Sequence, residues 1–372
     1  MSSLLLLAVI AVAGADVWLR RQYEPTLDAF REDLAANVDL FCEQQTQLAA
    51  DPWFHEPRTG GDAGPLLNAW LGWDPAPKMP EDSPLQVPAS LAEKKEWDAL
   101  LASEVDFSTL DFSWMRQLHA FDRWDTLANS PTPIQQPFSY MTAAIPNFIP
   151  LQQWAKYRLI HGIRTGQPVE AARDVRHLAW LAYRSDTLLG AMIATALLGI
   201  ERKAHESMKA PPPEWRPMSL EQQERLRAVM WASMSFSSVA APTEVARKAR
   251  HCGSAISRCI GLTEATLFAR YLRPFAEAPY RSAYEALDAE LASAPCPTSL
   301  ARILWERGAT LTDSSDLGTE MTDELRWMRR LPGGYARKHI AGILLSVGAQ
   351  NISLLKKLPT ATAPPAAADA TP

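Results

Sequence analysis

Residues 169–206 read VEAARDVRHLAWLAYRSDTLLGAMIATALLGIERKAHE, and this segment gives the clearest indication of the fold. It contains no proline, a residue that would remove a helical hydrogen bond and clash with the preceding turn. The polar group Ser185-Asp186-Thr187 predicts a turn between two helical arms. The second arm, from Leu188 to Ile200, is apolar on all sides and rich in Gly and Ala, which is typical of a helix packed closely in the centre of a bundle.

Proline placement extends this interpretation to the rest of the chain. The sequence has 29 Pro against 17 Gly, and 13 of the Pro fall between residues 51 and 150. Asn-Gly and Asp-Gly turns and alternating β-branched runs, the usual signs of strands, are absent. Seven proline-free windows are each long enough for a helix or a helical hairpin: 26–51, 89–130, 169–210, 218–241, 243–273, 298–331 and 333–358. The sequence therefore predicts an all-α fold, an irregular multi-helix bundle of antiparallel helical hairpins.

Capping signals place two of these helices more closely. Pro25 suits the first turn of a helix that reaches about Ala49. Ser219 and Gln222 have the spacing of a capping box, in which each side chain bonds the other residue's backbone N–H, and they predict a helix over 219–238.

The expected organisation is one all-helical domain over residues 23–358. Proline-rich connections interrupt it at 51–88 and 131–150. The first of these is expected to wrap over the bundle as an ordered loop, because it carries four large aromatic residues that are costly to expose, Trp53, Phe54, Trp70 and Trp73. Residues 359–372 are rich in Ala, Thr and Pro and predict a disordered tail.

Residues 1–22 predict a membrane segment. Residues 4–15 are unbroken apolar or small residues, and Arg20-Arg21 follow them. An uncleaved anchor would place Trp18 at the membrane interface and use the arginines to stop transfer, although it is short against the ~20 residues that a bilayer needs. A cleaved secretory signal ending at Ala13-Gly14-Ala15 is the alternative, and a helix in water would leave this run exposed. We prefer the anchor.

Two arguments about the side of the membrane conflict. The positive charges follow the apolar run rather than precede it, which favours a cytoplasmic body. Short N-terminal anchors commonly carry a domain that faces the cell envelope. A basic segment ahead of the apolar run would, in addition, reverse the first argument. We expect the body on the periplasmic, or extracytoplasmic, side.

Composition and charge exclude several classes of protein. Hydrophobic residues make up 47% of the 372 residues and charged residues 21%, which excludes collagen-like, low-complexity and polytopic membrane proteins. A formal net charge of −5 indicates no nucleic-acid partner. The charge is divided: residues 1–150 contain 9 Lys and Arg against 21 Asp and Glu, and residues 151–372 contain 28 against 21. Either the two halves attract each other, or one presents a charged face to a protein partner or an anionic surface.

No catalytic, cofactor-binding or metal-binding residue is assigned by motif. The sequence lacks a Gly-rich phosphate loop, G-x-G-x-x-G, H-E-x-x-H, C-x-x-C and G-x-S-x-G. One alternative is a metal-dependent hydrolase, because Asp174 with His177 and Glu201 with His205 could converge from two facing helices. The simpler interpretation is a solvated polar stripe with local ion pairs.

A second group of polar residues lies within 110–128, on an expected helix. His119, Asp122 and Asp125 are spaced at i, i+3 and i+6 there. Paired carboxylates beside a histidine can perform acid–base chemistry, but only in a cleft that shifts their pKa values. A surface cluster of ion pairs is the preferred interpretation.

The four cysteines leave the redox state open. Cys252 and Cys259 are expected on one helix face about 10 Å apart, too far to bridge each other. Either could pair with Cys42 or Cys296 in an oxidising compartment, and buried free thiols are the alternative.

The expected function follows mainly from the catalytic and binding motifs that the sequence lacks, from the predicted anchor and from the charge division. We expect a membrane-anchored, non-catalytic helical scaffold or interaction protein of the cell envelope, with protein partners and no cofactor. A glycan- or lipid-binding module is a third possibility, because the chain has 13 Trp and would then present a Trp-lined cleft.

Overall fold

The computed structural model describes residues 2–74, 77–92, 96–131, 144–238, 244–272, 287, 289–290, 293, 296 and 351–359. The side chains of residues 2–9, 19, 20, 23, 27, 90, 92, 237, 238 and 266–272 lie outside this description. The described part is mostly helical, as the sequence predicts. The only sheet among the described residues consists of two short antiparallel strands, β1 (Trp73–Asp74) and β2 (Ile145–Pro146).

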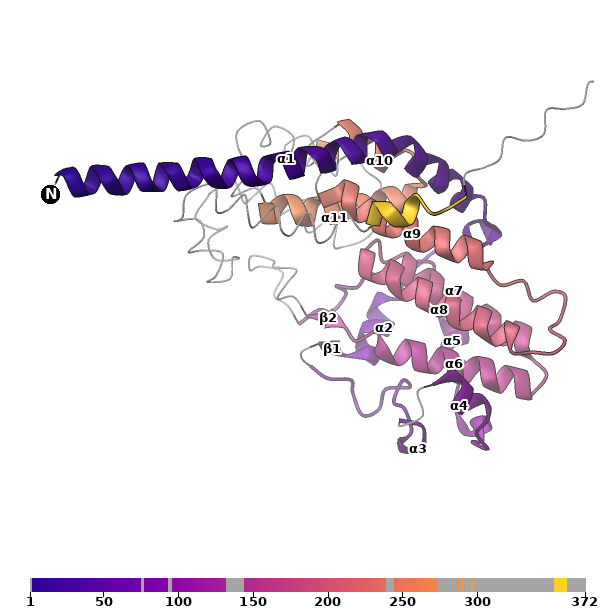
Figure 1. Cartoon of the computed structure of the whole chain (residues 1–372). Helices are drawn as coiled ribbons and strands as arrows, with labels where there is room; N and C mark the ends of the chain where they lie inside the picture. Colours follow the sequence, from indigo (N-terminus) through magenta and orange to yellow (C-terminus); the bar gives the residue numbers. More distant parts are fainter. Residues whose placement is uncertain are drawn as a thin grey trace, which may run out of the picture.

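The helices follow one another along the chain (Figure 1). In chain order, the helices before residue 120 are α1 (Ser2–Ala49), α2 (Gly64–Leu71), α3 (Ala89–Ala92), α4 (Trp97–Leu101) and α5 (Ser113–Leu118), with 3-10 turns at Pro52–His55 and Phe107–Thr109. The later ones are α6 (Ile149–Arg164), α7 (Pro168–Tyr183), α8 (Leu188–Glu206), α9 (Leu220–Ser238), α10 (Glu244–His251) and α11 (Ala255–Leu272).

Helices α7 and α8 pack along each other and form the centre of the fold, with α6 and α9 against them. The turn between them lies where the sequence predicts it. Thr187 caps α8 by accepting a hydrogen bond from the Gly190 backbone N–H at 3.0 Å. A Cβ atom at Gly190 would lie 1.9 Å from Oγ of Ser185, so only glycine allows the two arms to approach this closely. The expectation that α8 is surrounded on all sides is wrong at Met192, which is 38% exposed.

The segment from residue 51 to residue 131 wraps over α6 and α7. The indole N–H of Trp154 donates to the carbonyl of Leu85 at 2.9 Å, and the hydroxyl of Tyr157 donates to that of Leu91 at 3.3 Å. Buried Trp53 packs edge-on against Trp180 of α7. The contacts of Trp53 and Leu85 are those expected of a wrap at 51–88, although α2 and a 3-10 turn lie where a loop is expected. Most of the second proline-rich connection, at 132–143, lies outside the described residues.

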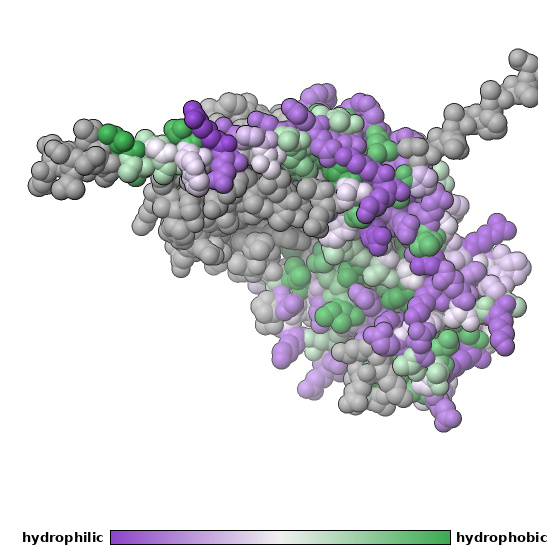
Figure 2. Space-filling model, in the orientation of Figure 1, coloured by the Kyte–Doolittle hydropathy of each residue, from purple (hydrophilic) through white to green (hydrophobic). Residues whose placement is uncertain are grey.

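Helix α1 runs past Pro25 without interruption, so the prediction that this proline opens the helix is wrong. Its later half packs on the body through buried Phe30, Leu34 and Phe41. Its earlier half projects beyond the other described elements (Figure 1). Hydrophobic residues are visible on the coloured part of the projecting half of α1, and hydrophilic residues follow where α1 crosses the body (Figure 2).

The predicted anchor at residues 1–22 gains no support from the described residues. Among them, we find no helical stretch with the length and apolar character that crossing a membrane requires. The side chains of residues 2–9, which include the first half of the apolar run, lie outside the description. The predicted tail at 359–372 also lies outside it, apart from Pro359.

Candidate functional site

A buried polar cluster lies where α6, α7 and the end of α5 meet. The carboxylate of Asp174 on α7 is 2% exposed and accepts a hydrogen bond from Nε of Arg158 on α6 at 2.7 Å. Nε2 of His119 lies 3.0 Å from the other oxygen of Asp174. The arginine supplies the charge that a buried carboxylate needs, so Asp174 is fixed as a structural anion between two helices.

His177 lies beside this cluster and is neutral. Its ring stacks on that of His119 with 4.6 Å between centroids, and its Nε2 lies 2.9 Å from the carbonyl of Leu118. Burial, followed by the charge of His119, lowers the pKa of His177 to about 4. A neutral imidazole that donates to a backbone carbonyl ties α7 to the end of α5.

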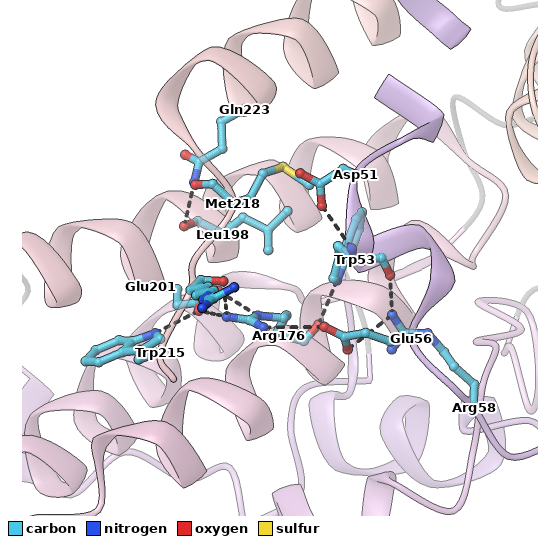
Figure 3. Close-up of polar contacts among 11 residues, drawn as sticks. Asp51, Trp53, Glu56, Arg58, Arg176, Leu198, Glu201, Trp215, Met218 and Gln223 are labelled. Atoms are coloured by element: carbon cyan, nitrogen blue, oxygen red, sulfur yellow. Dashed lines mark hydrogen bonds and ion pairs between the residues drawn. The ribbon is translucent and has the colours of Figure 1, made fainter. Parts of the chain in front are cut away.

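A second polar cluster surrounds Glu201 on α8, which is completely buried (Figure 3). The guanidinium of Arg176 on α7 donates to Oε1 of Glu201 at 2.6 Å and to Oε2 at 3.3 Å. The indole N–H of Trp215 donates to Oε1 at 3.0 Å. Although burial would lower the pKa of Arg176, the hydrogen bond and the charge of Glu201 raise it above its usual value.

Arg176 also links more distant segments to this cluster. It donates to Glu56 of the wrap at 3.4 Å (Figure 3). It also donates to the carbonyl of Arg216 at 2.9 Å. The same wrap is held by Arg58, which donates to the carbonyl of Trp53 at 2.7 Å. The cluster therefore ties the wrap and the segment before α9 to the α7–α8 pair.

The structure does not bring the four residues of the metal hypothesis together. Asp174 belongs to the first cluster, His177 lies beside that cluster, and Glu201 belongs to the second. The ring of His205 packs edge-on against Trp215, with 5.2 Å between centroids. Among the described residues, no group of three or more His, Cys, Asp or Glu side chains could hold a metal ion. The solvated-stripe interpretation is also wrong for Asp174 and His177, because both are buried.

The expected helix face of His119, Asp122 and Asp125 does not exist, because α5 ends at Leu118. His119 faces Asp174, and Asp122 lies 3.9 Å from Arg184. Asp125 accepts a hydrogen bond from the backbone N–H of Leu127 at 2.9 Å. The three residues therefore perform separate structural tasks.

All four cysteines are paired. Cys42 of α1 bonds Cys252, and Cys259 of α11 bonds Cys296. The expectation that Cys252 and Cys259 share a helix is wrong, because α10 ends at His251 and α11 begins at Ala255. The partners are those that the sequence allowed for an oxidising compartment, and the free-thiol alternative is wrong for this structure.

Several ion pairs join the acidic first 150 residues to the basic remainder. Lys248 pairs with Asp39, Lys356 with Asp33 at 2.6 Å, and Lys203 with Asp98 at 3.2 Å. The charge division thus serves, at these positions, to hold the two halves of the sequence together.

Tryptophan side chains lie mainly inside the molecule. Eight of them are buried: Trp53, Trp73, Trp97, Trp114, Trp124, Trp154, Trp180 and Trp215. Several pack edge-on in a core cluster, as Trp114 does on Trp154 with 5.8 Å between centroids. These buried rings are unavailable as a platform for a glycan.

Sequence reasoning missed the arginines that neutralise the buried carboxylates. Arg158 and Arg176 are the partners of Asp174 and Glu201, yet the sequence singled out only the acids and histidines. Arg158 lies within the helix segment WAKYRLIHGI, where it is followed by Leu159 and Ile160, and this apolar setting was the available signal.

Comparison with known proteins gives no relative: no family model, no curated protein and no solved structure matches the chain. The site must therefore be interpreted from its own contacts. Each polar cluster described above joins helices or loops, and the buried carboxylate in each is paired with an arginine.

Proposed function

We propose that this protein is a membrane-anchored, non-catalytic helical scaffold that holds protein partners on the extracytoplasmic side of the cell envelope. In this proposal, residues 1–22 are the anchor and the body is a bundle of antiparallel helical hairpins. The observation that carries it is the pairing of all four cysteines. Disulfides persist in oxidising compartments and are rare in the cytosol, so the pairing supports a body outside the cytoplasm.

The path of α1 supports the proposed membrane anchor. The helix continues from the apolar segment to Ala49 without a break, a length of about 72 Å at 1.5 Å per residue. Its body-bound half is held by the Cys42–Cys252 bond and by the ion pair of Asp39 with Lys248. A single helix that begins in the membrane and ends within the core would present the body at a fixed distance from the bilayer.

The buried polar clusters support a structural role. Asp174 is paired with Arg158, Glu201 is paired with Arg176, and His177 is bonded to backbone. Acid–base catalysis requires a group that can reach a substrate proton. These contacts instead fix the wrap and the helices, which gives a partner a rigid surface.

The first experiment traps thiols in intact cells with a membrane-permeant alkylating reagent before lysis, followed by mass measurement of the purified chain. We expect no alkylation of the four cysteines unless the protein is reduced first. The protein should also remain with membranes through a high-salt wash, whereas a variant lacking residues 1–22 should not.

The second experiment tests the scaffold itself. In-cell crosslinking of the full chain, followed by purification from membranes, should recover the same partner protein in repeated preparations. Alkylation of all four cysteines without prior reduction would contradict a body in an oxidising compartment. The absence of any reproducible partner would contradict the scaffold function.

A further inference from the structure

Two histidine rings are stacked where the wrap attaches to α7. The ring of His119, just beyond the end of α5, lies over that of His177 on α7, with 4.6 Å between centroids and 26° between planes. Nε2 of His177 lies 2.9 Å from the carbonyl of Leu118, so the buried ring donates a hydrogen bond to the backbone beside His119. Two imidazoles this close repel each other when both are charged. The pair therefore accommodates one added proton far more easily than two.

The two rings differ in their access to protons. The His119 side chain is 32% exposed, and its Nε2 lies 3.0 Å from a carboxylate oxygen of Asp174. These two atoms are not aligned as a hydrogen bond, so the attraction between them depends on the charge of the imidazole. His177 is 8% exposed and is bonded to backbone. The first added proton therefore goes to His119, which solvent reaches and a carboxylate faces.

Charged groups from three elements act on this histidine pair. Asp174 of α7 faces the exposed ring and also accepts a hydrogen bond from Arg158 of α6 at 2.7 Å. Arg158 lies 3.5 Å from a second carboxylate, that of Glu170 on α7. From the wrap, Arg58 places a positive charge near the buried ring of His177. Asp174 thus favours charge on the exposed ring, whereas Arg58 opposes charge on the buried one.

The backbone beyond α5 belongs to two segments of the wrap that are bonded to each other. These are residues 59–63 and 119–125, which we name the paired segments. The backbone N–H of Ala63 donates to the carbonyl of Arg123 at 2.9 Å and joins them. A change at the histidine pair is therefore transmitted to both segments.

Helix α7 holds the paired segments through side chains on one face. His177 bonds the carbonyl of Leu118, immediately before the second segment. About one turn later, the indole N–H of Trp180 donates to the carbonyl of Asp122 at 3.0 Å. The histidine bond is thus one of the attachments that keep the paired segments on the helix.

We propose that His119 and His177 form an acid-operated latch between α7 and the paired segments. The first added proton stays on His119 against Asp174 and leaves the latch closed. The second proton, on His177, is accepted when the paired segments separate from α7, because separation relieves the repulsion between the rings and lets water solvate the imidazolium. Opening also frees the indole N–H of Trp180. The latch is a property of the body and does not rest on the proposed anchor or scaffold function.

The titration of His177 agrees with this geometry. Burial, followed by the charge of His119, lowers the pKa of His177 to about 4, and Arg58 acts in the same direction. A histidine released into water titrates near pH 6.5. The open state therefore binds more protons than the closed one between these values. The stability of the closed latch is complete above about pH 6.5 and is lost as the pH falls toward 4.

Amide hydrogen exchange of the full chain measures the opening directly. Exchange should be read by mass spectrometry of peptides from pH 4.5 to pH 7.5 at constant ionic strength, and corrected for the intrinsic exchange rate at each pH. We expect the opening constant of the paired segments to rise by up to about tenfold for each pH unit below about 6, as uptake of one proton requires. Peptides from α8 should keep their protection, because α8 is not part of the latch.

Three variants decide the assignment. His177→Gln keeps an N–H donor for the carbonyl of Leu118 but does not titrate, so the rise in opening with acid should vanish. His119→Gln removes the neighbouring charge, so the rise at pH 4.5 should be several-fold smaller. His205→Gln is the matched control, because the half-buried ring of His205 packs on Trp215, and its profile should equal that of the unchanged protein.

Three results would overturn the proposal. An undiminished rise in His177→Gln contradicts the role of this ring, and an undiminished rise in His119→Gln contradicts the repulsion between the rings. An equal loss of protection in α8 would show that acid unfolds the whole body and opens no latch. If His177→Gln does not fold, an NMR titration of the histidine rings in the unchanged protein carries the decision. The His177 ring must then gain charge over the pH range in which the paired segments open, and a ring that gains charge while they stay protected contradicts the latch.

Discussion

Two regions of the molecule are held together in different ways. The wrapped region, residues 51–219, contains α2 to α8 and is joined by buried polar contacts, such as those of Glu201 and of Asp174. The cross-linked region consists of the body-bound half of α1 with α10 and α11. The Cys42–Cys252 bond joins α1 to the end of α10, the Cys259–Cys296 bond joins α11 to Cys296, and ion pairs add an exposed contact of Asp39 with Lys248 and a buried contact of Arg250 with Glu290. Helix α9 contacts both regions.

The difference follows from how much large apolar surface each region can bury. The wrapped region contributes most of the buried tryptophans. In the cross-linked region, α10 has only eight residues, of which Ala246, Ala249 and Arg250 are buried. A short helix whose only buried apolar residues among those described are two alanines gains little from burial. A covalent bond from Cys42 to Cys252 supplies the missing stability, provided the compartment allows it.

The largest effect is expected on breaking the longer covalent link. The Cys42–Cys252 bond spans 210 residues and the Cys259–Cys296 bond spans 37. Chain entropy then predicts losses of about 5 kcal/mol for Cys42→Ser/Cys252→Ser and about 4 kcal/mol for Cys259→Ser/Cys296→Ser. Urea unfolding of the two double variants, followed by circular dichroism, measures the difference.

Reduction of the unchanged protein serves as the control for these variants. It should lower the stability at least as far as the more damaging double substitution, and it should leave the Cys-free quadruple variant unaffected. A stability that is indifferent to reductant would show that the cross-linked region does not depend on its bonds.

The next effect tests the wrapped region. Glu201→Ala removes the carboxylate that Arg176 and Trp215 share, and leaves a largely buried guanidinium with only Glu56 and one carbonyl. We expect a loss of about 3 kcal/mol in the free energy of unfolding. Denaturant titration at neutral pH provides the measurement.

Glu206→Ala on the same helix is the matched control. Glu206 is 57% exposed and pairs only with Arg202, so the expected loss is below about 1 kcal/mol. Equal losses for the two variants would contradict the view that buried polar contacts hold the wrapped region.

The sequence predicted the wrapped region better than the cross-linked one. Proline at the helix ends and the turn at Ser185-Asp186-Thr187 are local signals, and the observed helices agree with them. By contrast, Pro25 lies inside α1 without ending it, because packing further along the helix outweighs a local preference at an exposed position. The pairing of Cys42 with Cys252 joins residues that are distant in sequence, and several pairings were equally allowed.

The candidate site was predicted only in part. The sequence singled out Asp174 and Glu201 by their spacing, but their arginine partners come from other positions and only the fold brings them near. The turn at Asp186 was predicted as a turn, but its burial was not. The backbone N–H of Trp124, more than 50 residues earlier, donates to the carbonyl of Arg184 beside this turn. Local patterns indicate elements, whereas the chemistry of a site depends on distant neighbours.

The pH dependence of stability tests the junction of the two regions. Burial raises the pKa of Glu264 to about 7, so Glu264 stabilises the fold below its unfolded pKa and this stability is lost as the pH rises toward 7. Burial lowers the pKa of His177 to about 4, so its contribution is present above pH 6.5 and is lost as the pH falls toward 4. Glu264→Gln should increase stability above pH 7 by roughly 2 kcal/mol and leave the acid side unchanged.

Guanidine unfolding between pH 4 and pH 8.5 measures this effect. Glu32→Gln, on the exposed face of α1, is the control and should leave the profile unaltered. A parallel shift of the Glu264→Gln curve at all pH values would show that the carboxyl contributes through packing and not through its charge.

The smallest effect concerns the start of α9, where the two regions meet. The backbone N–H of Gln222 donates to Oγ of Ser219 at 3.1 Å, as the predicted cap requires. The reciprocal bond of the capping box is replaced: the Gln222 side chain donates to the carbonyl of Gln47 on α1 at 3.4 Å. The next residue, Gln223, donates to the carbonyls of Leu198 on α8 and Met218. One helical turn thus bonds both regions.

Ser219→Ala should therefore cost about 1 kcal/mol, and Ser219→Asp should restore most of it. Ser207→Ala, which removes a hydroxyl at the end of α8, is the matched control with an expected change within about 0.5 kcal/mol. If the regions unfold as one unit, tryptophan fluorescence from the wrapped region and a probe on α10 will shift by the same amount. If α9 joins the two regions only loosely, Ser219→Ala will make the two probes report different unfolding transitions. The wrapped helices will then unfold at a lower denaturant concentration than the disulfide-bonded helices, because the turn that they share has been weakened.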